Sequence, residues 1–261
     1  MVSVTSLEGF DPMDIFNSKK EFKDWLLSHI DLTNLSPYMS DEKLKEFLDK
    51  ANNYGFKRVC IPITAVKKSK EFLEGKDIKI ITFISSFHGN RNNLDEKIKA
   101  CSDAISEGAD EIEFSSNLSL IGEKTAFEEE AASIVNAVKE GKKVSKLYLE
   151  IDYLPDDLVN QVIMSAQNSH PDYISIAINL KEDESYDGEN LNIAKERFEK
   201  IDSVIKDRKD INLKIYSNIN SFNDILPILY LSTKYKWDIQ SFRVGTEFGF
   251  DIIDGMDVSD F

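Results

Sequence analysis

The chain has 261 residues, 41% of them apolar and 30% charged, which predicts an ordered protein with a large core and a solvated surface. This length suits a single barrel of alternating strands and helices, which runs to about 250 residues. The 47 acidic and 32 basic residues give a formal net charge of -15, which repels phosphate backbones and anionic lipid headgroups. We therefore expect neither a nucleic-acid nor a membrane partner.

Targeting signals and disulfide patterns are not recognisable in the sequence. Two cysteines, Cys60 and Cys101, are too few for a disulfide framework in a chain of this size. The N-terminal stretch carries Glu8, Asp11 and Asp14 instead of a basic start followed by an apolar run, so we expect no signal peptide. No apolar run approaches the roughly 20 residues that span a bilayer. These features predict a cytoplasmic protein.

Short β-rich apolar segments alternate with longer segments of helical spacing along the chain. A first helix is predicted over residues 19–29, and we expect it to plug the barrel floor. Eight strands are predicted at residues 30–32, 58–62, 78–83, 111–115, 146–151, 173–178, 212–216 and 241–244. Helices between them are predicted at residues 41–54, 93–107, 124–139, 156–169, 191–206 and 222–235.

This alternation predicts an α/β fold, a closed (β/α)8 TIM barrel, formed as one domain by residues 1–261 with an N-terminal extension over about residues 1–28. An open doubly wound sheet is the alternative. No glycine-rich dinucleotide or P-loop fingerprint follows the first strand, which disfavours open-sheet nucleotide binders, and we expect no cofactor. In a barrel the working residues lie at the C-terminal ends of the strands and in the loops that follow.

Segments at these strand ends carry a resemblance to a known family. In chain order they read HIDLTNL from His29, VCIP from Val59, FHGN from Phe87, GADEIE from Gly108, LYLE from Leu147, DYI from Asp172, LK from Leu213 and FRVG from Phe242. Together they resemble the deoxyribose-phosphate aldolase family of class I aldolases, over about residues 30–249. The family reaction is the reversible aldol cleavage of 2-deoxyribose 5-phosphate to glyceraldehyde 3-phosphate and acetaldehyde.

The resemblance implies that an imine-forming lysine belongs on strand six, with a second lysine on strand seven and an aspartate on strand four as a proton relay. Here the strand-seven lysine is Lys214, the strand-four carboxylate is Glu113, and the strand-six position is Ser175. Serine cannot form an imine. Without a neighbouring ammonium, and beside Glu113, Lys214 is expected to be a salt-bridged cation and a poor nucleophile.

The segments that hold the substrate phosphate in the family also differ in this chain. The family has glycine-rich backbone after strand seven and serines after strand eight, whereas this chain has Ser217 and Asn218 in the first place and Glu247 in the second. A carboxylate at about 4 Å from a phosphate charge costs on the order of 4 kcal/mol at an effective dielectric of about 20. We therefore do not expect a phosphorylated sugar as the ligand.

Other residues are pocket candidates with a structural alternative. Asp31 and Thr33 either line the pocket or cap the following loop, and Cys60 is a small buried residue at a pocket position of the family. His88 is either a titrating pocket group or holds its loop by backbone hydrogen bonds. Ser175 and Asn179 complete the substrate-binding candidates. Carboxylates at Glu113, Glu150 and Asp152 lack a histidine or second carboxylate at ligand spacing, so no metal is expected.

Three functions remain open from the sequence. The first is a divergent family member that has lost imine chemistry, and the second is an active lyase or isomerase that uses Lys214 and Glu113 on an unphosphorylated carbonyl compound. The third is a non-catalytic ligand-binding or interaction barrel. In each case we expect a small carbonyl or sugar-like ligand and a monomer or homodimer. An open pocket at Lys214 would favour an enzyme, and a mouth filled by Ile176, Ile178, Tyr216 and Phe248 would favour an inactive site.

Overall fold

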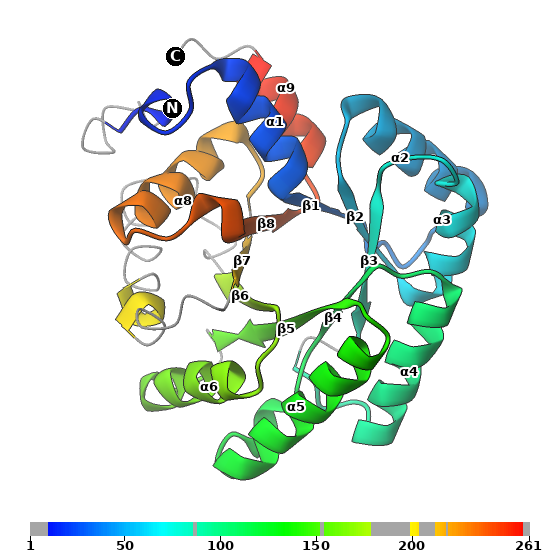
Figure 1. Ribbon diagram of the computed structural model, residues 1–261, viewed down its shortest axis with the longest axis vertical. Coiled ribbons are helices and arrows are strands. Elements are labelled where there is room, and N and C mark those ends of the chain that lie inside the picture. Colours follow the sequence, from blue (N-terminus) through cyan, green and yellow to red (C-terminus); the bar gives the residue numbers. More distant parts are fainter. Residues whose placement is uncertain are drawn as a thin grey trace.

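The structure is a computed structural model that describes residues 10–85, 88–151, 154–178, 199–203, 212–217 and 219–257. Eight parallel strands pair in chain order, and β1 also pairs with β8, so the sheet closes into a barrel (Figure 1). The strands are β1 (Ile30–Thr33), β2 (Arg58–Ile61), β3 (Lys79–Ile84), β4 (Glu111–Phe114), β5 (Val144–Glu150), β6 (Tyr173–Ile178), β7 (Asn212–Ser217) and β8 (Phe242–Thr246). This arrangement confirms the predicted (β/α)8 barrel.

Helices surround the barrel (Figure 1). They are α1 (Lys19–His29), α2 (Asp41–Tyr54), α3 (Val66–Phe72), α4 (Leu94–Glu107), α5 (Lys124–Glu140), α6 (Asp156–Asn168), α8 (Phe222–Lys234) and α9 (Gly249–Asp257). Residues 199–203 are helical too, and the rest of the predicted helix 191–206 lies outside the described residues. Neither α3 nor α9 was predicted, because α3 has only seven residues and α9 contains two glycines.

Local sequence signals explain where the neighbouring helices begin and end. Asn93 and Glu96 form a capping box at the start of α4, each side chain accepting a hydrogen bond from the other residue's backbone N–H. Gly108 ends this helix at φ 113°, in the left-handed region that favours glycine, and Gly55 ends α2 in the same way at φ 92°. The following strands β4 and β2 therefore start at fixed points.

The helix α1 does not plug the barrel floor as we expected. Its buried residues Phe22, Trp25 and Leu26 form one apolar stripe, which is directed toward other helices. The Phe22 ring lies 5.8 Å from the ring of Phe222 at the start of α8, and the Trp25 indole N–H donates to the carbonyl of Ile239. Figure 1 shows α1 beside α9, outside the ring of strands. The expectation was wrong because the apolar stripe fits the outer helical layer.

Alternation along the strands separates two buried regions. On β6, Ile174 and Ile176 belong to the large apolar core between the strands and helices, whereas Ser175 and Ala177 do not. Successive strand residues point to opposite faces, so Ser175 and Ala177 face the barrel interior. The interior also holds the buried charged side chains of Asp31, Glu113 and Lys214, whereas the outer core is apolar.

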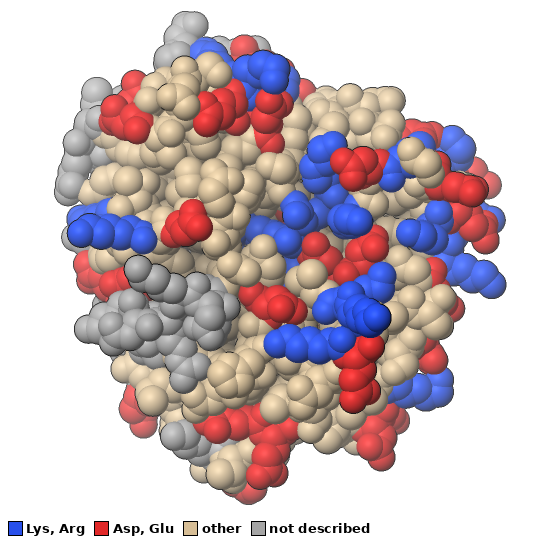
Figure 2. Space-filling model, viewed as in Figure 1, with Lys and Arg blue, Asp and Glu red and all other residues tan. Residues whose placement is uncertain are grey.

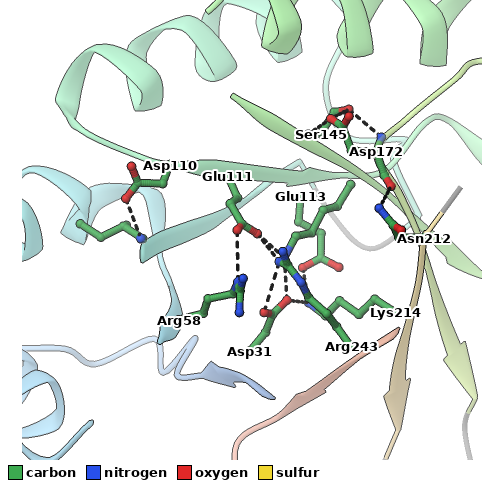
Figure 3. A network of polar contacts seen from close by, with 12 residues as sticks. Asp31, Arg58, Asp110, Glu111, Glu113, Ser145, Asp172, Asn212, Lys214 and Arg243 are labelled. Carbon is green, nitrogen blue, oxygen red and sulfur yellow. Dashed lines mark hydrogen bonds and ion pairs between the residues drawn. The ribbon is translucent and has the colours of Figure 1, made fainter. Parts of the chain in front are cut away.

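Polar contacts between neighbouring strands fix where the strands start. Asp110 accepts a hydrogen bond from the backbone N–H of Ile80, and Asp172 accepts bonds from the N–H and hydroxyl of Ser145 (Figure 3).

In the view of Figure 2, Lys and Arg side chains gather near the middle of the face, over the strands, with acidic side chains among them. Among the described helices, none is long and apolar enough to cross a membrane.

Candidate active site

A network of buried charges occupies the interior of the barrel (Figure 3). Lys214 on β7 places its Nζ 2.6 Å from Glu113 Oε2 on β4 and 3.2 Å from Asp31 Oδ2 on β1. The side chains of all three residues are at most 3% exposed. An ammonium between two carboxylates at these distances is a strong charge-assisted contact. Lys214 is thus a fully engaged cation.

A second buried lysine extends the network. Lys146 on β5 lies 2.6 Å from Asp31 Oδ2 and 2.7 Å from Glu111 Oε2, and its side chain is completely buried. Arg243 on β8 lies 2.6 Å from Glu111 Oε2 and 3.7 Å from Asp31 Oδ1. Asp31 therefore faces two lysines and one arginine at once.

The charges inside the barrel balance. Three carboxylates, at Asp31, Glu111 and Glu113, face three buried cations. Arg58 adds a partly exposed cation at the edge of the network, 3.3 Å from Glu111 Oε1. Burying unpaired charges costs several kcal/mol per ion. The pairing of opposite charges offsets this cost for the six side chains inside the barrel.

The network shifts the pKa of Lys214, Asp31 and Glu111 in the direction that keeps each of them ionised. Burial opposes the charge of Lys214, but Glu113 and Asp31 together raise its pKa well above the usual value. Burial likewise opposes the charge of Asp31, and the cations Lys146, Lys214 and Arg243 bring its pKa far below the usual range. For Glu111, burial is outweighed by Lys146 and Arg243, which lower the pKa to about 2.

Ser175 lies directly beside Lys214. The two residues are register partners on β6 and β7, and Tyr148 on β5 is the partner of Ser175 on its other side. The Ser175 side chain is completely buried, and its Oγ has no hydrogen-bond partner within the described residues. The position that the family resemblance assigns to the imine lysine is thus occupied by a short hydroxyl next to the surviving lysine.

The described part of the mouth above this network is narrow. The space left there for water amounts to about 10 Å³, roughly the room of one water molecule. Its walls are Thr33, Leu35, Cys60, Phe83, Glu113, Tyr148 and Tyr216. The Tyr148 ring packs edge-on against Phe83 at 5.3 Å and against Tyr216 at 6.3 Å.

The side chains that fill the mouth differ from those we expected. Tyr216 lines it as predicted, but Ile176 is part of the outer core and Phe248 is 42% exposed. The side chain of Ile178 lies outside the described residues. Ile176 is excluded from the mouth by strand alternation, since its neighbour Ser175 faces inward. The aromatic rings of β3, β5 and β7 take the place of these two residues.

Backbone packing contributes to the closed interior. Gly245 on β8 is the register partner of Tyr216. A Cβ atom at Gly245 would lie 2.6 Å from Tyr216 Cδ2 and 2.7 Å from Lys214 Cε. Glycine is therefore required there for the side chains of Lys214 and Tyr216 to pack side by side.

The region that would receive a phosphate carries a negative charge. Glu247 is exposed and lies two residues before the first residue of α9, Gly249. Burial and the Glu247 carboxylate raise the pKa of Tyr216 to about 12, so Glu247 acts on the mouth itself. Thr246 Oγ1 accepts a hydrogen bond from the Phe248 N–H, which occupies one of the donors at this helix start. The Glu247 carboxylate and the occupied donor therefore both disfavour a phosphate at this helix start.

The remaining predicted residues divide into two groups. The first group comes together in the interior and at its mouth, and consists of Asp31, Thr33, Cys60, Glu113, Ser175 and Lys214. Burial raises the pKa of the Cys60 thiol to about 12, so it is an unreactive thiol. The second group lies outside the described residues and consists of Asp152, Asn179, Asn218 and the Ser217 side chain. No group of three or more metal-ligating side chains occurs in the described ranges.

His88 takes a position at the rim. Its Nε2 lies 2.8 Å from Glu150 Oε2 at the end of β5, and its side chain is 47% exposed. The loop that contains His88 is anchored by buried Lys97, which donates to the Gly89 carbonyl and lies 3.1 Å from Glu130. Glu130 in turn accepts a hydrogen bond from the Asn117 N–H. The loops after β3 and β4 are thereby held together.

Four residues of the interior network were missed from the sequence: Arg58, Glu111, Lys146 and Arg243. A signal was present on β4, because Glu111 and Glu113 are two residues apart. A spacing of two on a strand places both side chains on the same face. Charges at that spacing on otherwise apolar strands indicate an interior that holds ion pairs.

Comparison with known proteins agrees with this geometry. A deoxyribose-phosphate aldolase from Aciduliprofundum boonei is 32% identical over 152 residues, covering 57% of this chain and 68% of the relative. The corresponding enzyme from Caldanaerobacter subterraneus is 34% identical over 131 residues, which span only 56% of the relative's length. No protein-family model matches the chain.

Solved structures show the same fold. The deoxyribose phosphate aldolase from Aeropyrum pernix, described as a tetramer, superposes with a TM-score of 0.75 over 94% of this chain and 95% of that chain, at 20% identity. Triosephosphate isomerase from Bartonella henselae reaches a TM-score of 0.56. With the sequence relatives and the barrel taken together, the chain belongs to the deoxyribose-phosphate aldolase family.

Proposed function

We propose that this chain is a member of the family that does not carry out the imine-based aldol reaction. The observation that supports this most directly is the state of Lys214, which lies between Glu113 and Asp31 at 2.6 and 3.2 Å beside a serine. Imine formation needs a neutral amine. With its pKa above 10.5, fewer than about one molecule in 3,000 carries a neutral Lys214 at pH 7.

The other buried amine offers no replacement. Lys146 is held by Asp31 and Glu111 at 2.6 and 2.7 Å with no exposed surface. An attacking amine must also approach the carbonyl carbon closely, to about 3 Å. The space beside Glu113 and Tyr216 has room for about a single water, which is too small for an aldehyde.

The alternative of a lyase or isomerase with Lys214 and Glu113 as acid and base needs the same access. The two groups are close enough to exchange a proton, but each is already the other's partner and a substrate has no room between them. The phosphorylated substrate named for the relatives is disfavoured further by Glu247. We also propose a reducing, cytoplasmic setting, in keeping with the free and buried thiols Cys60 and Cys101.

Reductive trapping tests this proposal. The protein is incubated with acetaldehyde and borohydride, digested, and each lysine peptide is examined for the mass of an added ethyl group. Lys214 and Lys146 should be modified less than exposed Lys20, and Lys214→Met should leave the pattern of the other peptides unchanged. Selective modification of Lys214 or Lys146 at a low aldehyde concentration would show that a reactive amine exists and that the proposal is wrong.

A further inference from the structure

Another, larger cavity lies beside the barrel mouth, between the C-terminal end of β3 and the helix α4, and Phe83 lines both spaces. It has about 330 Å³ of space for water, within the range of about 300–1,000 Å³ typical of small-molecule sites. The wall combines apolar side chains with three polar ones: Ile63, Phe83, Ile84 and Ala100, and Ser85, Arg91 and Asn92. We refer to this cavity as the β3–α4 cleft.

Arg91 supplies a positive charge to the cleft. It is exposed, and it makes no ion pair or hydrogen bond with any other described residue. The chain has 47 acidic residues, yet none of the described ones pairs with Arg91. A guanidinium presents a planar fork of donors that matches carboxylate and phosphate oxygens.

Ser85 supplies an unsatisfied hydroxyl to the wall of the same cleft. Its backbone has φ 77°, a conformation that a residue other than glycine, asparagine or aspartate seldom adopts. Its buried Oγ has no hydrogen-bond partner among the described residues. Backbone strain and an unpaired buried polar atom both have a free-energy cost. A serine side chain turns readily between rotamers, so an oxygen bound in the cleft would provide the missing partner.

We propose that the β3–α4 cleft binds a small organic anion. Its carboxylate or phosphate group lies against the Arg91 guanidinium and the Ser85 hydroxyl, and its apolar part packs on Phe83 and Ile84. The net charge of -15 disfavours large polyanions, and the volume of the cleft limits the ligand to a small molecule. The inference is independent of the proposed loss of imine chemistry, because none of the three polar residues belongs to the barrel interior.

Titration followed by nuclear magnetic resonance tests the inference. The chain contains five arginines, so the side-chain Nε–Hε signals are few, and the Arg91 signal is assigned as the one lost in Arg91→Gln. The probes are benzoate, its neutral analogue benzamide, and inorganic phosphate. Benzoate or phosphate should shift the Arg91 signal with saturation, and benzamide should bind at least about tenfold more weakly.

Two variants separate a site from a general charge effect. Arg91→Gln should weaken anion binding by about tenfold or more, whereas Lys20→Gln, which removes the same charge from the exposed start of α1, should leave it unchanged. Saturation by benzoate alone identifies a carboxylate ligand, and saturation by phosphate alone identifies a phosphate ligand. The inference is overturned if neither anion saturates at tens of millimolar, if benzamide binds as tightly as benzoate, or if both variants behave alike.

Discussion

Replacing Asp31 by asparagine should destabilise the protein more than any other single change in the charge network. Asp31 is completely buried and faces Lys146 at 2.6 Å, Lys214 at 3.2 Å and Arg243 at 3.7 Å. Without its charge, two interior carboxylates would face three buried cations. Removing one partner of a buried ion pair costs about 3–5 kcal/mol, a large part of a total stability of about 5–15 kcal/mol.

The measurement is urea denaturation followed by circular dichroism, with thermal unfolding as a second reading. A loss of this size lowers the melting temperature by roughly 6 to 20 °C in a domain of this length. Asp24→Asn is the matched control. Asp24 pairs with Lys20 at a similarly short distance of 2.7 Å, but both side chains are exposed. Water and salt therefore screen the pair, and the midpoint should hardly move.

The pH dependence gives an independent check of the same reasoning. The network lowers the folded-state pKa of Asp31 below its ordinary value of 3.8, so ionised Asp31 favours the folded state. This contribution is fully present above about pH 4 and is lost as the pH falls from there toward the folded pKa. The gap between the wild type and Asp31→Asn should therefore shrink below pH 4. A destabilisation below about 1 kcal/mol at pH 7, or a gap that does not change with pH, would refute the account.

Three further changes test other parts of the structure. Ser175→Lys places a third ammonium beside Lys214 in a full interior, so we expect a loss of several kcal/mol in urea denaturation and no deoxyribose 5-phosphate cleavage in an aldehyde assay; substantial activity would contradict both site arguments. Gly89→Ala should destabilise by at least about 2 kcal/mol, because φ is 69° and a Cβ would lie 2.1 Å from the Ser116 carbonyl oxygen; an unchanged urea midpoint would contradict this packing. Ser85→Gly should be more stable than Ser85→Ala by about 1 kcal/mol, since only glycine relieves the positive φ; the reverse order would rule out strain at this position.

Much of the fold followed from patterns that are local in the sequence. The alternation of apolar strands with helical segments predicted all eight strands, and the largest shifts at their ends are two residues. The strand β5 begins at Val144, two residues before the predicted start, because Asp110 and Asp172 anchor its first residues to the neighbouring strands. Such anchors join residues about 30 positions apart and leave no local signal.

The candidate site was predictable only in part, for a similar reason. The lysine on β7 and the carboxylate on β4 were identified through the family resemblance, and they do meet in the interior. Lys146 was missed because its partners Asp31 and Glu111 lie 115 and 35 positions away in the chain. The wrong expectation for Ile176 came from placing a whole segment at the mouth, whereas a strand presents only alternate residues there.

The charge balance of the interior changes how Ser175 should be understood. Taken alone, a serine in place of the imine lysine is the loss of one nucleophile. Inside this barrel, a lysine at 175 would be a fourth buried cation facing three carboxylates, next to Lys214 in register. The amine of that lysine would have to be neutral, or its charge would have no carboxylate partner. Because Lys146 and Arg243 already balance Asp31 and Glu111, the serine is consistent with an interior whose charges stabilise the fold, and a reactive amine would require at least one of these ion pairs to be given up.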